Sequence, residues 1–126
     1  MSIPKLINSD KAPGAVGPYS QALAGAGLIY TSGQLPIDPK TKAIPEDVST
    51  QTATALENLK SVLKAGGSDL GKVLKTTVYL ADINDFPAVN EVYAEYFSQP
   101  FPARSCFAVK DLPLGARIEI EAVALA

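Results

Sequence analysis

Residues 47–67 read DVSTQTATALENLKSVLKAGG, and this segment carries the clearest structural signal in the chain. Asp47 suits the positively polarised start of a helix, and Gly66 suits its end. A helix over residues 47–65 is therefore predicted, and its apolar side is formed by residues at spacings of three and four: Val48, Thr52, Ala55, Leu56, Leu59, Val62 and Leu63.

The flanking segments predict one further helix and several strands. A helix over residues 85–98 is predicted with Pro87 in its first turn, where a missing N–H costs nothing. Its inner side is formed by aromatic and branched residues: Phe86, Val89, Val92, Tyr93, Tyr96 and Phe97. Two apolar segments flank Gly25-Ala26-Gly27, a pattern typical of a β-hairpin. Strands are predicted at residues 5–8, 19–24, 28–32, 73–81, 103–109 and 117–125.

Together these elements predict an α+β fold in a single domain, residues 1–126. We expect one mixed or antiparallel sheet with both helices on the same face. The other face of the sheet then has no cover within the chain. If that face is apolar, association with further copies of the chain is the economical way to bury it.

The composition excludes several kinds of chemistry. The 126 residues contain no histidine, which removes serine–histidine and cysteine–histidine catalysis and most zinc sites. The net charge is −2 and the lysines are scattered along the chain, so no basic stripe for nucleic acid is expected.

The sequence also bears on the compartment. A single cysteine cannot form an internal disulfide, which is typical of a reducing environment. The first ten residues lack the apolar core of a signal peptide, and no apolar run reaches the length of a membrane span. We expect a cytoplasmic protein, with an organellar matrix as the alternative.

Residues 66–73, GGSDLGKV, come close to the phosphate-binding pattern G-x-x-x-x-G-K-[ST]. The last position is Val73, which has no hydroxyl for a magnesium ion. The segment also follows a helix and opens a strand, whereas a phosphate-binding loop does the reverse. We predict a helix end and a one-turn connector here.

The first candidate site lies in PARSCFAV, residues 102–109. Arg104 and Cys106 are two positions apart on a predicted strand and therefore share one face. A charged side chain in this setting needs an anionic partner, which is either an internal carboxylate or the carboxylate of a substrate. Cys106 is expected to be a small buried residue rather than a nucleophile, because no histidine can activate it.

Two further segments are candidates. The alternation of Ile118-Glu119-Ile120-Glu121 places both glutamates on one strand face, which is either solvated or carries a carboxylate that orients a water. The spacing does not distinguish Glu119 from Glu121. The segments GPYS and TSGQ, with Gly33 at a strand end, predict either ordinary turns or a close approach of backbone to a ligand.

Several segments of the chain resemble those of the RidA family, the YjgF-like proteins. In chain order they are APGAVGPYSQA, YTSGQLPIDP, VYLADINDFPAVNEVY, PARSCFAV and IEIEAVAL. The resemblance covers almost the whole chain. It implies a fold like that of chorismate mutase and a homotrimer with ligand clefts between subunits. It also implies hydrolysis of 2-imino acids, or their enamine tautomers, to 2-keto acids and ammonia.

The resemblance assigns roles residue by residue. Arg104 would hold the substrate carboxylate, and Glu119 would position and polarise the attacking water. The remaining residues would line or shape the cleft: Tyr19, Ser32, Gly33, Asn90 and Cys106. No cofactor or metal would be required, because a protonated imine is already a good electrophile and needs only positioning, a water and a proton route.

Two other functions remain alternatives for a chain of this family. One is a ribonuclease that inhibits translation, which the absence of histidine and the acidic balance oppose. The other is a non-enzymatic module that binds a small carboxylate or protects client proteins. The small 2-imino acid and further copies of the chain are the expected partners, with neither nucleic acid nor membrane among them.

Overall fold

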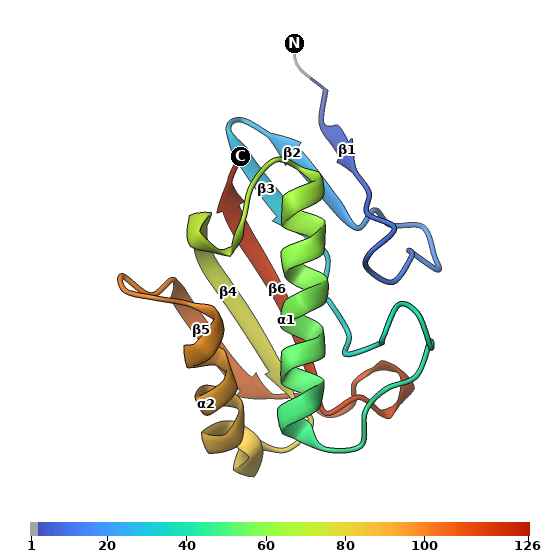
Figure 1. Ribbon diagram of the computed structural model, residues 1–126, viewed down its shortest axis with the longest axis vertical. Helices are drawn as coiled ribbons and strands as arrows, with labels where there is room; N and C mark the ends of the chain where they lie inside the picture. Colours follow the sequence, from blue (N-terminus) through green and yellow to red (C-terminus); the bar gives the residue numbers. More distant parts are fainter. Residues whose placement is uncertain (1–2) are drawn as a thin grey trace.

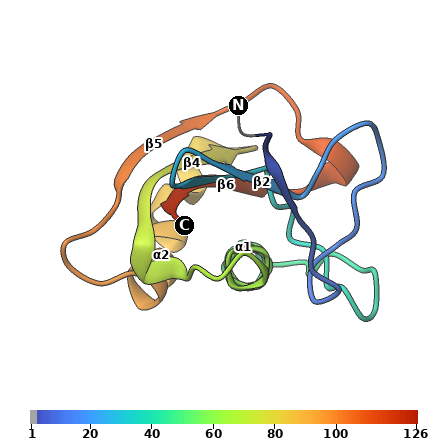
Figure 2. The same cartoon turned by 90° about the horizontal axis from the view of Figure 1, so that it is seen from above.

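The structure is a computed structural model that describes residues 3–126. Its six strands form one sheet in the order β1-β2-β3-β6-β4-β5, with both helices on the same face (Figures 1 and 2). The elements are β1 Lys5–Ile7, β2 Ala22–Gly25, β3 Leu28–Thr31, α1 Val48–Ala65, β4 Val73–Leu80, α2 Phe86–Tyr96, β5 Ala103–Ala108 and β6 Ile118–Leu125. The predicted α+β fold and the predicted order of elements are confirmed.

The sheet is mixed. Only β4 and β5 pair in parallel, and α2 makes the connection between them, whereas the other neighbouring strands are antiparallel. Such a connection is the βαβ unit, and its helix must lie on a face of the sheet. The chain therefore carries α2 directly over the edge strand β5.

Helix α1 begins and ends where the sequence predicts. The Asp47 carboxylate accepts a hydrogen bond from the Thr50 N–H at 2.9 Å, which is an N-cap. At the other end Gly67 has φ +82°, and the Ser68 N–H bonds the Leu63 carbonyl, so the helix closes in a Schellman motif. The short 3-10 turn Leu70–Lys72 then leads into β4. The phosphate-loop pattern is thus a helix end and connector, as predicted.

One strand prediction is wrong at its start. The strand predicted at residues 19–24 begins only at Ala22, and Tyr19 lies in a loop. The Tyr19 N–H bonds the Gly17 carbonyl at 2.8 Å, so the turn at Gly17-Pro18 uses a donor that the sheet would otherwise need.

The core lies between the sheet and the helices. Alternate residues of β6 are buried on the helix-covered face, and β4 contributes Thr76, Val78 and Leu80 to the same layer. No helix among residues 3–126 is long and apolar enough to cross a membrane. The opposite face carries a cross-strand row of apolar side chains that residues 3–126 leave at least partly exposed: Leu6, Leu23, Tyr30 and Val123.

Candidate active site

Arg104 lies on edge strand β5 and faces α2. It is the register partner of Thr76, whose side chain is buried under the helices, so Arg104 and Cys106 project to the helix-covered side of the sheet. The shared face of Arg104 and Cys106 is confirmed.

Helix α2 forms a seat for the Arg104 guanidinium. Phe86, Asn90 and Tyr93 follow each other at spacings of four and three, which places them on one side of the helix. The guanidinium carbon lies 5.3 Å from the centre of the Phe86 ring and 4.8 Å from that of Tyr93. One Arg104 N–H donates to Asn90 Oδ1 at 2.8 Å. Two cation–π contacts and one hydrogen bond therefore fix the group.

Arg104 has no acidic partner among residues 3–126. No carboxylate of the described chain lies within 4.0 Å of it, and its only hydrogen bond there goes to Asn90. The other arginine, Arg117, does form an ion pair, with Asp85 at 2.9 Å. Of the two predicted alternatives for Arg104, the internal ion pair is therefore wrong, and most of its five donors are left for a ligand.

Cys106 follows Arg104 on the same face and is partly buried. Burial raises the pKa of its thiol, against the opposing effect of the Arg104 charge. A protonated thiol is a poor nucleophile, so the geometry suits a wall of the site rather than a covalent role.

Glu119 lies on the other, uncovered face of the sheet. It is the register partner of Tyr79, and its carboxylate extends over Gly33. Between Tyr30↔Val123 and Gln34↔Ile120 the strand containing Gly33 advances four residues while β6 advances three, which is a β-bulge. The bulge brings the Gly33 backbone against Glu119, so that a Cβ atom at position 33 would overlap the Glu119 carboxylate in its present position.

The two glutamates, which the sequence pattern could not separate, have different surroundings. Glu121 Oε1 accepts a hydrogen bond from the Tyr79 hydroxyl at 2.9 Å. The Glu119 carboxylate accepts none from residues 3–126, and it lines a cavity that Glu121 does not reach. Burial raises the pKa of Glu119, and the negative charge of Glu121 raises it further. Glu119 is thus the carboxylate available to a water.

The cavity beside Glu119 has a volume of about 900 Å³. Tyr19, Ser32 and Gly33 line it together with Glu119. Its other walls come mainly from apolar residues of loops 13–16, 35–37 and 113–114. The Ser32 hydroxyl donates to the Ser20 carbonyl at 2.6 Å, so it holds the loop that carries Tyr19 in place.

The predicted residues therefore form two groups on opposite faces of the sheet. Arg104, Asn90 and Cys106 lie together under α2, whereas Glu119 and its cavity lie on the uncovered face. Within one chain the sheet separates the cation from the carboxylate, so a substrate cannot touch both.

Sequence reasoning missed Phe86 and Tyr93 as parts of the site. Both were assigned to the inner side of the second helix, which is correct for Tyr93, because it is 5% exposed and its hydroxyl lies 2.8 Å from that of Thr76. The available signal was their spacing from Asn90 along the helix, which places all three on one side.

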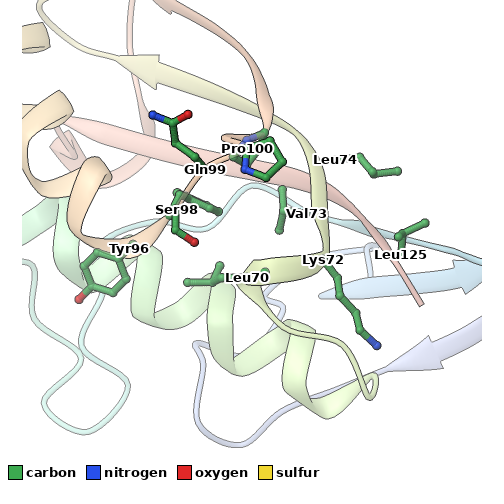
Figure 3. Close-up of a pocket in the computed structure, with 12 residues that line it drawn as sticks. Leu70, Lys72, Val73, Leu74, Tyr96, Ser98, Gln99, Pro100 and Leu125 are labelled. Atoms are coloured by element: carbon green, nitrogen blue, oxygen red, sulfur yellow. The ribbon is translucent and has the colours of Figure 1, made fainter.

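A second cavity, of about 290 Å³, lies between the connector after α1 and the end of α2. It contains none of the predicted site residues, and Figure 3 shows the Lys72 side chain extending away from Tyr96 and Ser98. Nor do residues 3–126 contain a group of three or more carboxylate or thiol side chains arranged for a metal ion. The predicted site residues therefore lie outside the second cavity, in the two groups around Arg104 and Glu119.

The architecture and the two groups define an α+β protein with an arginine that has no acidic partner among residues 3–126 and a separate cavity lined by Glu119. The sequence model of the family described as "Endoribonuclease L-PSP" matches residues 9–126. The chain belongs to this family, the RidA or YjgF-like proteins that its sequence resembles.

Several relatives carry the name of an activity. The chain is 47% identical over 124 residues to the 2-iminobutanoate/2-iminopropanoate deaminase of Salmonella typhimurium, a match that spans 96% of this chain and 97% of the relative. It is 51% identical over 124 residues to the human protein of the same name, spanning 98% and 90%. The crystal structure of Escherichia coli TdcF with bound serine superimposes with a TM-score of 0.93 at 42% identity, covering 97% and 98%.

Proposed function

We propose that this chain hydrolyses reactive 2-imino acids, such as 2-iminobutanoate and 2-iminopropanoate, to 2-keto acids and ammonia. The observation that carries the proposal is Arg104, a guanidinium held by two rings and an amide yet without a carboxylate partner in residues 3–126. A planar guanidinium binds a carboxylate through two parallel hydrogen bonds, and every 2-imino acid has a carboxylate beside its imine carbon. The names of the Salmonella and human relatives support the same activity.

The complete site needs more than one copy of the chain. Arg104 and Glu119 lie on opposite faces of one sheet, so a cleft between two subunits is the arrangement that brings them to one substrate. The uncovered apolar row on the Glu119 side offers the surface for this contact. We infer a homotrimer with one cleft at each subunit interface, in agreement with the family resemblance.

The chemistry needs two side chains and a water. Arg104 holds the carboxylate and thereby places the imine carbon near Glu119 of the neighbouring subunit. Glu119 takes a proton from a water, whose oxygen bonds to the carbon of the protonated imine and converts it to a carbinolamine. The same carboxyl then returns the proton to the amine nitrogen. As the C–N bond breaks and ammonia leaves, the Glu119 carboxylate takes the hydroxyl proton, the carbonyl forms, and the proton passes on to ammonia or solvent. Burial raises the pKa of the Glu119 carboxyl, which makes its carboxylate a stronger base toward the water.

The remaining site residues have supporting roles. Asn90 orients the guanidinium, and Cys106 lines the pocket beside it. Tyr19, Ser32 and Gly33 shape the wall that surrounds the Glu119 carboxylate. Every step uses side chains of the protein and water, so no cofactor is part of the mechanism.

The description of the family as an endoribonuclease names the second candidate function. The chain has no histidine and a net charge of −2, and we therefore expect no catalysis on RNA and no nucleic-acid partner. The lone cysteine favours a reducing compartment, which supports a cytoplasmic or organellar-matrix protein.

A coupled assay tests the proposal. A threonine dehydratase generates 2-iminobutanoate, semicarbazide traps it, and the protein under test competes by hydrolysing it. We expect the wild-type chain to lower semicarbazone formation and Arg104→Ala to lose this effect. Arg117→Lys is the control, because it changes the other arginine and keeps its charge. Equal competition by wild type and Arg104→Ala would refute the proposed clamp.

A further inference from the structure

The uncovered face holds a second carboxylate, which the proposed mechanism leaves without a role. Glu121 lies two residues after Glu119 on β6, so both side chains project from the same face. Its Oε1 accepts the Tyr79 hydroxyl at 2.9 Å, whereas Glu119 accepts no hydrogen bond from residues 3–126. A carboxylate beside a catalytic one affects it even without direct contact, since like charges repel across such distances.

Tyr79 is itself held firmly. It pairs with Glu119 in the register of β4 and β6, and its hydroxyl reaches diagonally to the next residue on that face, Glu121. Its ring meets the Phe107 ring edge to face, with centroids 5.5 Å apart and planes at 84°. An aromatic ring with few rotatable bonds thus fixes the Glu121 carboxylate close to Glu119.

We propose that Glu121, anchored by Tyr79, is a positioning residue whose fixed negative charge keeps the Glu119 carboxyl able to return the proton it takes from water. The inference rests on the proposed role of Glu119. Glu121 touches neither the water nor the substrate in this account. It acts through the field that it places on Glu119.

The other charged or titratable groups around Glu119 are few in the described chain. Tyr79 is its register partner on β4, and the cavity beside it is also lined by Tyr19, from the loop before β2, and by Lys42, from the loop after β3. The wall at residues 113–114 contributes no charge. Lys42 is exposed, so solvent screens its charge. Besides these groups, the strand of Glu119 itself carries the anion Glu121. The charge of Glu121 adds to burial in raising the pKa of Glu119.

The direct test is a titration of the glutamate carboxyl carbons by ¹³C NMR, on the full-length protein labelled at glutamate. The chain has six glutamates, and the Glu119 signal is assigned by its loss in Glu119→Gln. We expect the titration midpoint of Glu119 to fall in Glu121→Gln, because the repelling charge is gone. We expect a fall in Tyr79→Phe as well, because the freed Glu121 side chain turns toward solvent. Glu95→Gln, an exposed charge removed from α2, leaves the midpoint unchanged.

The pH profile of deamination is the second readout. At low pH, where protonation of Glu119 lowers the activity, Glu121→Gln should exceed wild-type kcat/KM by about threefold. This ratio is the Boltzmann factor for the repulsion of two unit charges roughly 7 Å apart in water. The plateau at higher pH should fall, by no more than about threefold, because a Glu119 carboxylate of lower pKa is a weaker base toward the water.

The two readouts separate the inference from the proposed function. A Glu119 midpoint that is the same in wild type and Glu121→Gln would overturn the inference, whatever the activity. If instead the midpoint falls but no variant, nor the wild type, hydrolyses the imine, the coupling between the glutamates stands and the proposed function fails. A loss of the folded NMR spectrum in Tyr79→Phe would leave Glu121→Gln as the deciding variant.

Discussion

Gly33→Ala should abolish most of the activity without unfolding the protein. A Cβ atom at position 33 would lie 2.7 Å from Cδ of Glu119 and closer still to Oε2. The added atom meets the end of a flexible side chain rather than backbone, so the carboxylate moves and the fold stays. To reach an ordinary contact, the carboxylate must retreat by roughly 1 Å.

The magnitude follows from this displacement. A misplacement of roughly 1 Å in a reacting group costs about 100-fold in rate, or about 2.7 kcal/mol of transition-state stabilisation. Gly33 does not have a positive φ, so alanine is compatible with its backbone. The free energy of unfolding should therefore change by less than about 1 kcal/mol.

The assay measures kcat/KM for 2-iminobutanoate in the dehydratase-coupled system, and urea unfolding of the same samples measures stability. Gly25→Ala is the matched control, because a Cβ there meets nothing within 4 Å. Retention of wild-type kcat/KM by a folded Gly33→Ala protein would refute the reasoning, since Glu119 would then tolerate displacement. Loss of activity together with loss of folding would show that the bulge, rather than Glu119, had failed.

Three further changes test other parts of the account. Tyr93→Leu removes a ring from the Arg104 seat and should raise KM about tenfold with little change in kcat. Tyr93→Phe keeps the ring and should retain most of the affinity. Steady-state kinetics measure KM and kcat for both variants. Cys106→Ala should keep kcat within about threefold, because a partly buried, protonated thiol is a poor nucleophile, and a loss beyond about 100-fold would contradict this. Because burial raises the folded-state pKa of Glu119, its ionisation opposes folding as pH rises above the ordinary carboxyl range. Glu119→Gln should therefore be more stable than wild type at pH 7 and lose this advantage at pH 3, as urea unfolding at the two pH values would measure.

Local signals in the sequence predict the helices well, because caps and spacing lie within one segment. Asp47 and Gly66 bound α1 in the structure as they do in the pattern. The strand predicted to start at Tyr19 fails for an equally local reason, since the turn at Gly17 already uses the Tyr19 N–H. The shared face of Arg104 and Cys106 follows from strand alternation alone.

The arrangement of the site depends on pairing between distant segments, which local patterns do not encode. The bulge that sets Gly33 under Glu119 exists only because β3 pairs with β6 in a particular register. Whether Arg104 and Glu119 share a face depends on the registers of β5 and β6 with β4. The seat for Arg104 requires α2 to cross over β5, so Phe86 and Tyr93 were assigned to the inner side of α2 without a role in the site.

In the proposed assembly, one active site draws Arg104 from one subunit and Glu119 from another. Subunit complementation tests it most directly. Arg104→Ala and Glu119→Gln proteins, each inactive alone, are unfolded together in equal amounts and refolded into mixed assemblies. The account predicts recovery of about one quarter of wild-type activity, because a cleft is intact only when each neighbour supplies its unaltered residue. If the refolded mixture has the correct oligomeric state but no activity above the separate variants, the two residues do not form a site shared between subunits.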